Sequence, residues 1–116
     1  MNDYILLYQG GDPDWASNTS PEEMQMAMAA WQDWMTQLSE QGKLVSGGDP
    51  LHYAGKRVTP EGVVTDIATS ELKELVSGYS IVKADTIEEA VEMAKSCPIM
   101  YSPNIVVEVR EVQKLG

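Results

Sequence analysis

The chain has 116 residues and a formal net charge of −10, and it contains one cysteine, Cys97. This length suits one domain over residues 1–116, and a lone cysteine excludes both an internal disulfide and a cysteine-built metal site. The acidic excess repels phosphate backbones and disfavours a nucleic-acid partner, while no apolar stretch reaches the ~20 residues of a membrane span.

Residues 3–9, "DYILLYQ", predict a short strand that ends at the turn cluster "GGDPD". Tyr4, Leu6 and Tyr8 share one face, and the two aliphatic side chains between them share the other, so both faces need cover. The apolar run has strand length and no basic start, unlike a signal peptide. We therefore expect a soluble cytoplasmic protein.

Residues 20–42 predict a long amphipathic helix. Ser20 is a good N-cap, Pro21 suits the first helical position, and Gly42 can end the helix. Its apolar stripe follows three- and four-residue steps and consists of Met24, Ala27, Met28, Trp31, Trp34, Met35 and Leu38. Such a stripe can line a ligand pocket, but core packing is the commoner reason for it.

The middle of the chain predicts short elements. "KLVSG" indicates a short strand, and "KRVTPEGVVTD" indicates a hairpin that turns at Thr59-Pro60-Glu61-Gly62. "TSELKELVS" suits only a turn or two of helix. "GYSIVKA" then predicts another strand, in which Tyr79 and Ile81 alternate with Ser80 and Val82.

Residues 85–98 predict a second helix, which Thr86 caps and Pro98 stops. Its inward stripe comprises Ile87, Ala90, Val91, Ala94 and Cys97. Cys97 is expected to be a buried small hydrophobe, because a nucleophile would need a basic neighbour near the thiol. The alternation in "NIVVEVREVQ" then predicts a final edge strand with one wet face.

This order of elements predicts an α+β sandwich of ferredoxin-like type, with both helices on one face of an antiparallel sheet. The two strands expected at the centre are apolar on both faces, and two helices cover only one face. A second copy of the chain, packed sheet on sheet in a homodimer, would cover the other. In the alternative, the loop and hairpin between Gly48 and Thr69 fold over that face.

Several segments resemble the YCII-related family, in its DGPF branch, over nearly the whole length. They are "YILLYQGG", "SPEEMQMAMAAWQDWMTQLSEQGKLVSGGDPL", "GKRVT", "VTDIATSELKELVSGYSIVKADTIEEAVEMAKSCPI" and "IVVEVREV". The stretch 77–98, a Gly-Tyr strand followed by a helix that stops at Cys-Pro, is the most specific. The resemblance implies a ferredoxin-like dimeric α+β barrel.

Two family features are missing from the sequence. The segment that names the branch, Asp-Gly-Pro-Phe, is replaced by residues 66–69, Asp-Ile-Ala-Thr, so that only Asp66 is retained. The resemblance also associates some members of the wider superfamily with a histidine in the first helix and an aspartate after the second strand. That helix position falls near Trp31, so the acid–base pair does not carry over, and the family implies fold far more than activity.

His52, the only histidine, lies in "GGDPLHYAG" with Asp49 three residues before it. A histidine shuttles protons near neutral pH and a carboxylate orients it, so His52 with Asp49 or Asp66 is the candidate catalytic set. Tyr4, Tyr8 and Tyr79 are candidate ligand-binding residues, which can bind or polarise a substrate oxygen. A lone histidine in such a loop is more often exposed than catalytic.

Two hypotheses from different classes follow from these observations. The first is a small homodimeric module that binds a small molecule or acts as an accessory protein. The second is a cofactor-free lyase or isomerase that uses His52 with a nearby aspartate. Neither needs a cofactor: one histidine without paired ligand spacing gives no metal site, and the two Gly-Gly pairs lack the spacing of a phosphate loop.

Overall fold

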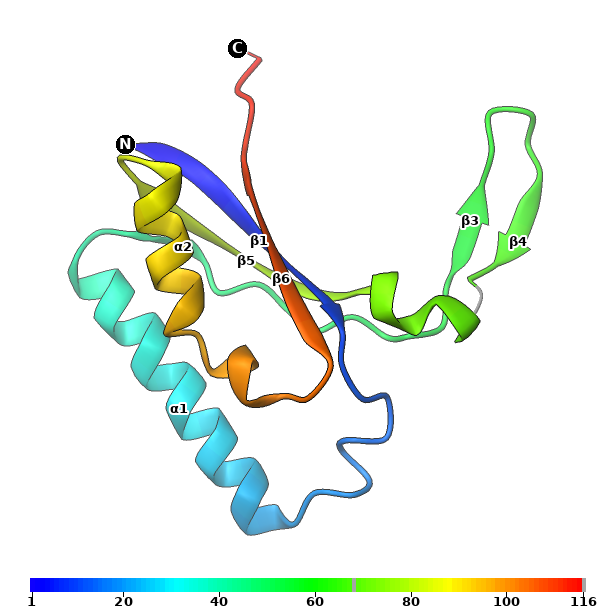
Figure 1. Cartoon of the computed structure of the whole chain (residues 1–116), viewed down its shortest axis with the longest axis horizontal. Coiled ribbons are helices and arrows are strands. Elements are labelled where there is room, and N and C mark those ends of the chain that lie inside the picture. Colours follow the sequence, from blue (N-terminus) through cyan, green and yellow to red (C-terminus); the bar gives the residue numbers. More distant parts are fainter. Residues whose placement is uncertain (68, 116) are drawn as a thin grey trace.

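The computed structural model describes residues 1–67 and 69–115. Within them the chain forms a four-stranded antiparallel sheet with two helices, and a two-stranded hairpin stands apart (Figure 1). The sheet order is β2-β5-β1-β6, so β5 and β1 are central. The elements are β1 (Asn2–Gly10), α1 (Pro21–Glu40), β2 (Leu44–Ser46), β3 (Lys56–Val58), β4 (Val64–Asp66), η1 (Thr69–Glu74), β5 (Val76–Ala84), α2 (Ile87–Lys95), η2 (Pro98–Tyr101) and β6 (Ile105–Glu111). The expected α+β arrangement is confirmed.

Side-chain caps set the start of both helices. The Ser20 hydroxyl accepts a hydrogen bond of 3.1 Å from the Glu23 N–H, and the Thr86 hydroxyl accepts one of 3.2 Å from the Glu89 N–H. Each bond satisfies a donor that the first helical turn leaves unpaired. The local sequence therefore determines where each helix begins.

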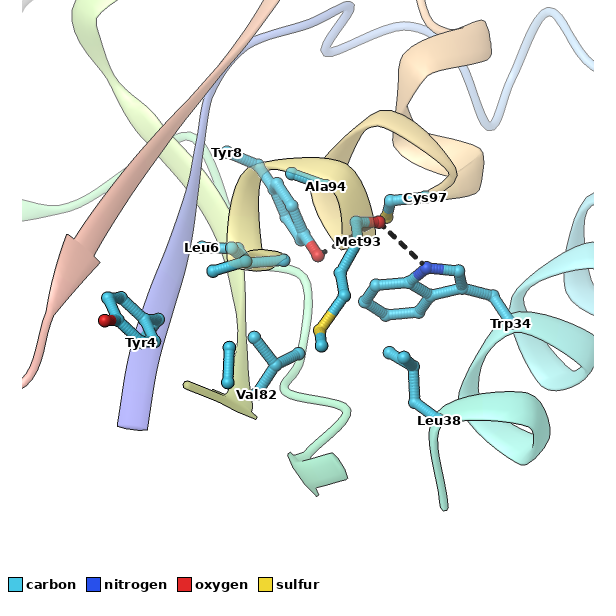
Figure 2. Packing of buried hydrophobic residues seen from close by; sticks show 11 residues of the cluster. Tyr4, Leu6, Tyr8, Trp34, Leu38, Val82, Met93, Ala94 and Cys97 are labelled. Carbon is cyan, nitrogen blue, oxygen red and sulfur yellow. Dashed lines mark hydrogen bonds between the residues drawn. The ribbon is translucent and has the colours of Figure 1, made fainter. Parts of the chain in front are cut away.

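The core lies between the helices and one face of the sheet (Figure 2). Alternate residues of the central strands point into it, where they meet Trp34 and Leu38 of α1. The fully or nearly buried hydrophobic members are Tyr4, Leu6, Tyr8, Trp34, Leu38, Val82, Ala84, Ala90, Met93, Ala94 and Cys97. This cluster is the main source of hydrophobic stabilisation within one chain.

Two residues of the predicted stripes are exposed, Met28 and Ile87. Met28 is 66% exposed, and Figure 1 shows that the beginning of α1 extends away from the strands. Ile87 is 43% exposed at the first position of α2. Helical spacing alone predicted both as buried, but spacing does not show how far a helix overlaps the sheet that it covers.

The other face of the sheet is apolar at its centre and is not covered by α1 or α2. Leu7 pairs with Tyr79 and Ile5 pairs with Ile81 across β1 and β5, and all four side chains are partly exposed. We call these four residues the open face. The sequence alternation predicted them correctly, because strand residues two apart share a face.

The hairpin of β3 and β4 projects away from the sheet, and we call residues 56–66 the arm (Figure 1). Its turn is closed by a 2.9 Å hydrogen bond from the Thr59 N–H to the Val63 carbonyl oxygen, and Gly62 has a φ of +85°. Every residue of the two strands is exposed. The alternative in which the hairpin folds over the open face is therefore not the arrangement found here.

Candidate functional site

The candidate site is the loop 47–55, which leaves β2 and is held against the central strands. The Ser80 hydroxyl donates a 2.8 Å hydrogen bond to the Gly47 carbonyl oxygen. Gly48 follows with a φ of +71°, and a Cβ at this position would lie 1.7 Å from the Tyr79 carbonyl oxygen. Only glycine permits both this backbone conformation and this close approach.

The second half of the loop is anchored on both sides of His52. The Leu51 N–H donates a 2.8 Å hydrogen bond to the Ser77 carbonyl oxygen. The Tyr53 hydroxyl donates a 3.0 Å hydrogen bond to the Gly10 carbonyl oxygen at the end of β1. The backbone that carries His52 is thus fixed relative to the two central strands.

The predicted catalytic residues are all exposed, and the structure does not join them in a hydrogen-bonded set. Among the described residues, neither His52 nor Asp49 forms a hydrogen bond or an ion pair through its side chain. Asp66 lies on the arm, where Lys56 on the facing strand forms an ion pair with it. Acid–base chemistry by His52 with either aspartate stays a prediction.

The sheet separates the three predicted ligand-binding tyrosines. Tyr4 and Tyr8 are 2% and 3% exposed on the helix side, whereas Tyr79 is partly exposed on the open face. The Tyr4 hydroxyl donates a 3.3 Å hydrogen bond to a Glu111 carboxylate oxygen at the edge strand. One cleft of a single chain therefore cannot hold all three, and ligand binding by any one of them stays a prediction.

A buried polar chain beneath the loop was not found by sequence reasoning. The Tyr8 hydroxyl donates a 2.7 Å hydrogen bond to the Ser80 hydroxyl, which in turn donates to the Gly47 carbonyl. Since the single Tyr8 hydroxyl proton goes to Ser80, we assign the thiol of Cys97, 3.5 Å from the Tyr8 oxygen, as a donor to that oxygen. The buried polar chain thus links the end of α2 to the candidate loop.

Burial keeps the two acidic groups of the buried polar chain, the Tyr8 hydroxyl and the Cys97 thiol, protonated. It raises the pKa of the Tyr8 hydroxyl above its ordinary value, and the neighbouring Cys97 adds to the rise. Burial also raises the pKa of the Cys97 thiol. The expectation of a buried, unreactive Cys97 agrees with its 1% exposure, because the thiolate is the reactive form.

Aromatic rings flank the buried polar chain on the helix side of the sheet. The ring centroids of Tyr8 and Trp31 are 5.8 Å apart, and those of Trp31 and Trp34 are 5.7 Å apart, both in edge-on geometry. Trp31 stands near the position where the family resemblance implied a histidine. In this chain that position therefore provides an aromatic wall and not a proton carrier.

A shallow groove of about 240 Å³ lies between α1 and α2, away from the loop. Its lining includes Trp34, whose indole N–H donates a 3.2 Å hydrogen bond to the Met93 carbonyl (Figure 2). Lys43 and Glu89 form a 2.8 Å ion pair at its rim. The hydrogen bond within this pair lowers the pKa of the Glu89 carboxyl.

The described residues include no group of three His, Cys, Asp or Glu side chains that could hold a metal ion.

Comparison with solved structures shows the fold. The chain is similar to 5-chloro-2-hydroxyhydroquinone dehydrochlorinase (TftG) from Burkholderia phenoliruptrix AC1100, solved in complex with 2,5-dihydroxybenzoquinone. The TM-score is 0.52 at 17% sequence identity, and the match covers 97% of this chain and 95% of that one. The curated proteins gave no significant match.

In the part of the chain that the structure describes, no helix has the length and apolar character of a membrane span.

The family follows from the sequence over almost the whole length. The model of the YCII-related domain matches residues 4–115. This range includes the candidate loop, the buried polar chain beneath it and both central strands. The chain belongs to the YCII-related family.

Proposed function

We propose that the chain forms a homodimer through the open face and acts as a small-molecule binding or accessory module. The open face supports the dimer, because Ile5, Leu7, Tyr79 and Ile81 form a contiguous apolar centre. On the β6 side this centre is bordered by the ion pair of Glu108 and Arg110, which lie opposite Leu7 and Ile5. Apolar patches of this kind mark protein contacts. A two-fold axis would place the same patch of each copy against the other.

The shape of one chain also supports a partner. Its radius of gyration is 15.6 Å, whereas about 13 Å is expected for a compact chain of this length. Its extents are 45 × 43 × 18 Å, so it is a flat layer rather than a sphere. Packing a second layer on the open face would give a more compact particle.

The anchored loop is the observation that carries the binding proposal. Hydrogen bonds from Leu51 and Tyr53 hold the backbone on both sides of His52, and the imidazole itself is exposed. Ordered loops with exposed polar side chains commonly carry binding sites. The related dehydrochlorinase was solved with a hydroxylated quinone, so we propose a small planar oxygen-rich molecule as ligand.

A thermal-shift screen tests binding with hydroxyquinones, phenols, small organic acids and lactones. We expect at least one class to raise the Tm of the wild-type protein, because a ligand that binds only the folded state stabilises it. His52→Ala should lose the shift, whereas Glu40→Ala, at the exposed end of α1, should keep it. A screen in which no compound shifts the Tm would contradict the binding proposal.

Sedimentation velocity of Leu7→Asp tests the dimer. Leu7 lies at the centre of the open face, opposite Tyr79, and a carboxylate there would be desolvated in the interface. We expect wild-type protein to sediment as a dimer and Leu7→Asp as a monomer. A wild-type protein that stays monomeric at about 100 µM would contradict the dimer.

A cofactor-free lyase or isomerase is the second candidate function. It is favoured by the fixed backbone around His52 and by the fold likeness to a dehydrochlorinase. The acid–base pair would be His52 with Asp49 or Asp66, and the imidazole would move the proton. Turnover of a compound found in the screen, abolished in His52→Ala, would support the enzyme; unchanged turnover in that variant would exclude this role.

A further inference from the structure

The arm has one apolar side that its own chain leaves uncovered. Val58 pairs directly with Val64, so both side chains lie on the same side of the hairpin, and they are 68% and 58% exposed. At the base, the Ile67 N–H donates a 3.0 Å hydrogen bond to the Gly55 carbonyl oxygen, and Lys56 forms an ion pair with Asp66. The arm is therefore well specified in register but unsupported by a core.

Physical chemistry argues against such an arm standing alone. An isolated two-stranded hairpin is marginally stable in water, and it needs a packed apolar face to become stable. In this chain the turn at Gly62, the strand register and the valine pair all specify the hairpin. A sequence that determines a hairpin so fully is expected to give its apolar side something to pack against.

The exposed area is large enough for a second contact surface. One chain exposes 7990 Å², whereas a compact monomer of this mass exposes about 6300 Å² by the usual scaling with mass. The surplus is roughly twice the ~800 Å² that each partner contributes to an interface of standard size. The open face and the arm can therefore both be buried in one dimer.

Charge makes a second copy a suitable partner for the arm. The chain carries a net charge of −10, but the arm, residues 56–66, contains two basic and two acidic side chains and is formally neutral. Of the surfaces that one copy offers, a neutral apolar one is repelled least by another acidic copy. Two-fold symmetry would bury both arms in the same assembly.

We propose that the arm of each subunit docks on the body of the second copy and covers Val58 and Val64 there. This inference rests on the homodimer proposed above. The arm begins directly after the candidate loop, at Lys56, and its base is tied to Gly55. Docking would therefore bring the partner subunit next to the loop that carries His52, so that each site is completed by the dimer.

A matched pair of variants tests the docking. Val64→Asp and Thr65→Asp introduce the same charge at neighbouring positions of β4, but their side chains lie on opposite sides of the hairpin. In sedimentation velocity over about 0.1 to 100 µM, we expect Val64→Asp to raise the dimer Kd at least ~tenfold and Thr65→Asp to change it less than ~threefold. Both variants should keep the wild-type far-UV spectrum, because each position is exposed.

The result with Leu7→Asp separates this inference from the dimer proposal. If Leu7→Asp is monomeric while Val64→Asp and Thr65→Asp both dimerise like the wild type, arm docking is overturned and the open-face dimer stands. If Val64→Asp weakens the dimer and Leu7→Asp does not, arm docking stands and the open-face interface fails. A wild-type monomer overturns both.

Hydrogen exchange on the wild-type protein gives a test that needs no variant. Docked arms should protect the amides of residues 56–66 at about 100 µM and release them when dilution separates the copies. Protection factors for α2 provide the internal reference, since its core contacts lie within one chain. Arm amides that exchange at the same rate at all concentrations would overturn docking.

Discussion

The Tyr8 hydroxyl donates a 2.7 Å hydrogen bond to the Ser80 hydroxyl, and this contact joins the two central strands inside the core. Both side chains are buried, Ser80 completely. Because Ser80 in turn donates to the Gly47 carbonyl, the bond also fixes the start of the loop that carries Asp49 and His52. The stability of the core and the geometry of the candidate site are thus linked.

Tyr8→Phe should destabilise the protein by about 1–3 kcal/mol, because it removes the donor to Ser80 and leaves the buried Cys97 thiol without its acceptor. Urea unfolding measures the change. Tyr4→Phe is the matched control: the Tyr4 hydroxyl reaches a Glu111 carboxylate in a partly exposed contact, so its loss should cost less than ~1 kcal/mol. Equal losses of unfolding free energy in the two variants would show that the buried polar chain adds no stability of its own.

Gly48→Ala should be more destabilising than Gly42→Ala, although the two glycines have nearly equal φ values of +71° and +70°. A Cβ at residue 48 would overlap the Tyr79 carbonyl, whereas none of the surrounding atoms lies within 4 Å of a Cβ at residue 42. We expect Gly42→Ala to lower the free energy of unfolding by about 1 kcal/mol, because its backbone is strained, and Gly48→Ala to lower it by about 3 kcal/mol. Chemical denaturation of both variants checks the difference, which should vanish only if the loop moves away from β5.

Alkaline pH should weaken the fold through Cys97. Its folded-state pKa is raised by burial, so its contribution to stability is complete below the ordinary thiol pKa of about 8.5 and is lost as pH rises toward the folded value. Cys97→Ser keeps a hydroxyl donor at this position but does not titrate in this range. The fall in unfolding free energy between about pH 8.5 and 10 should therefore be shallower in Cys97→Ser than in the wild type; parallel pH profiles would exclude this role for the thiol.

Glu89 should titrate below the ordinary glutamate value because of its hydrogen bond with Lys43. A lowered pKa means that its contribution to stability is present above the unfolded value of about 4.3 and is lost as pH falls through the folded value. NMR titration of the Glu89 carboxyl carbon measures this directly. Lys43→Met should move the pKa up toward the ordinary value, and Lys95→Met, at the exposed end of α2, should leave it in place.

The amino-acid sequence by itself determined the helices, the strands, the hairpin turn and the two-faced character of β1 and β5. These features depend on neighbouring residues: caps at Ser20 and Thr86 satisfy local donors, and alternation along a strand assigns residues to faces. The burial of Cys97 also followed from helical spacing. Local periodicity was therefore sufficient for the fold class.

Only the tertiary structure decided which residues meet. The buried polar chain, which runs from Cys97 through Tyr8 and Ser80 to Gly47, joins segments far apart in sequence. No local sequence pattern therefore indicates it. The separation of Tyr79 from the other candidate tyrosines and the exposure of Met28 likewise depend on sheet order and on how far α1 overlaps the sheet. Contacts of this kind follow from the register of distant strands, which a one-residue shift would change completely.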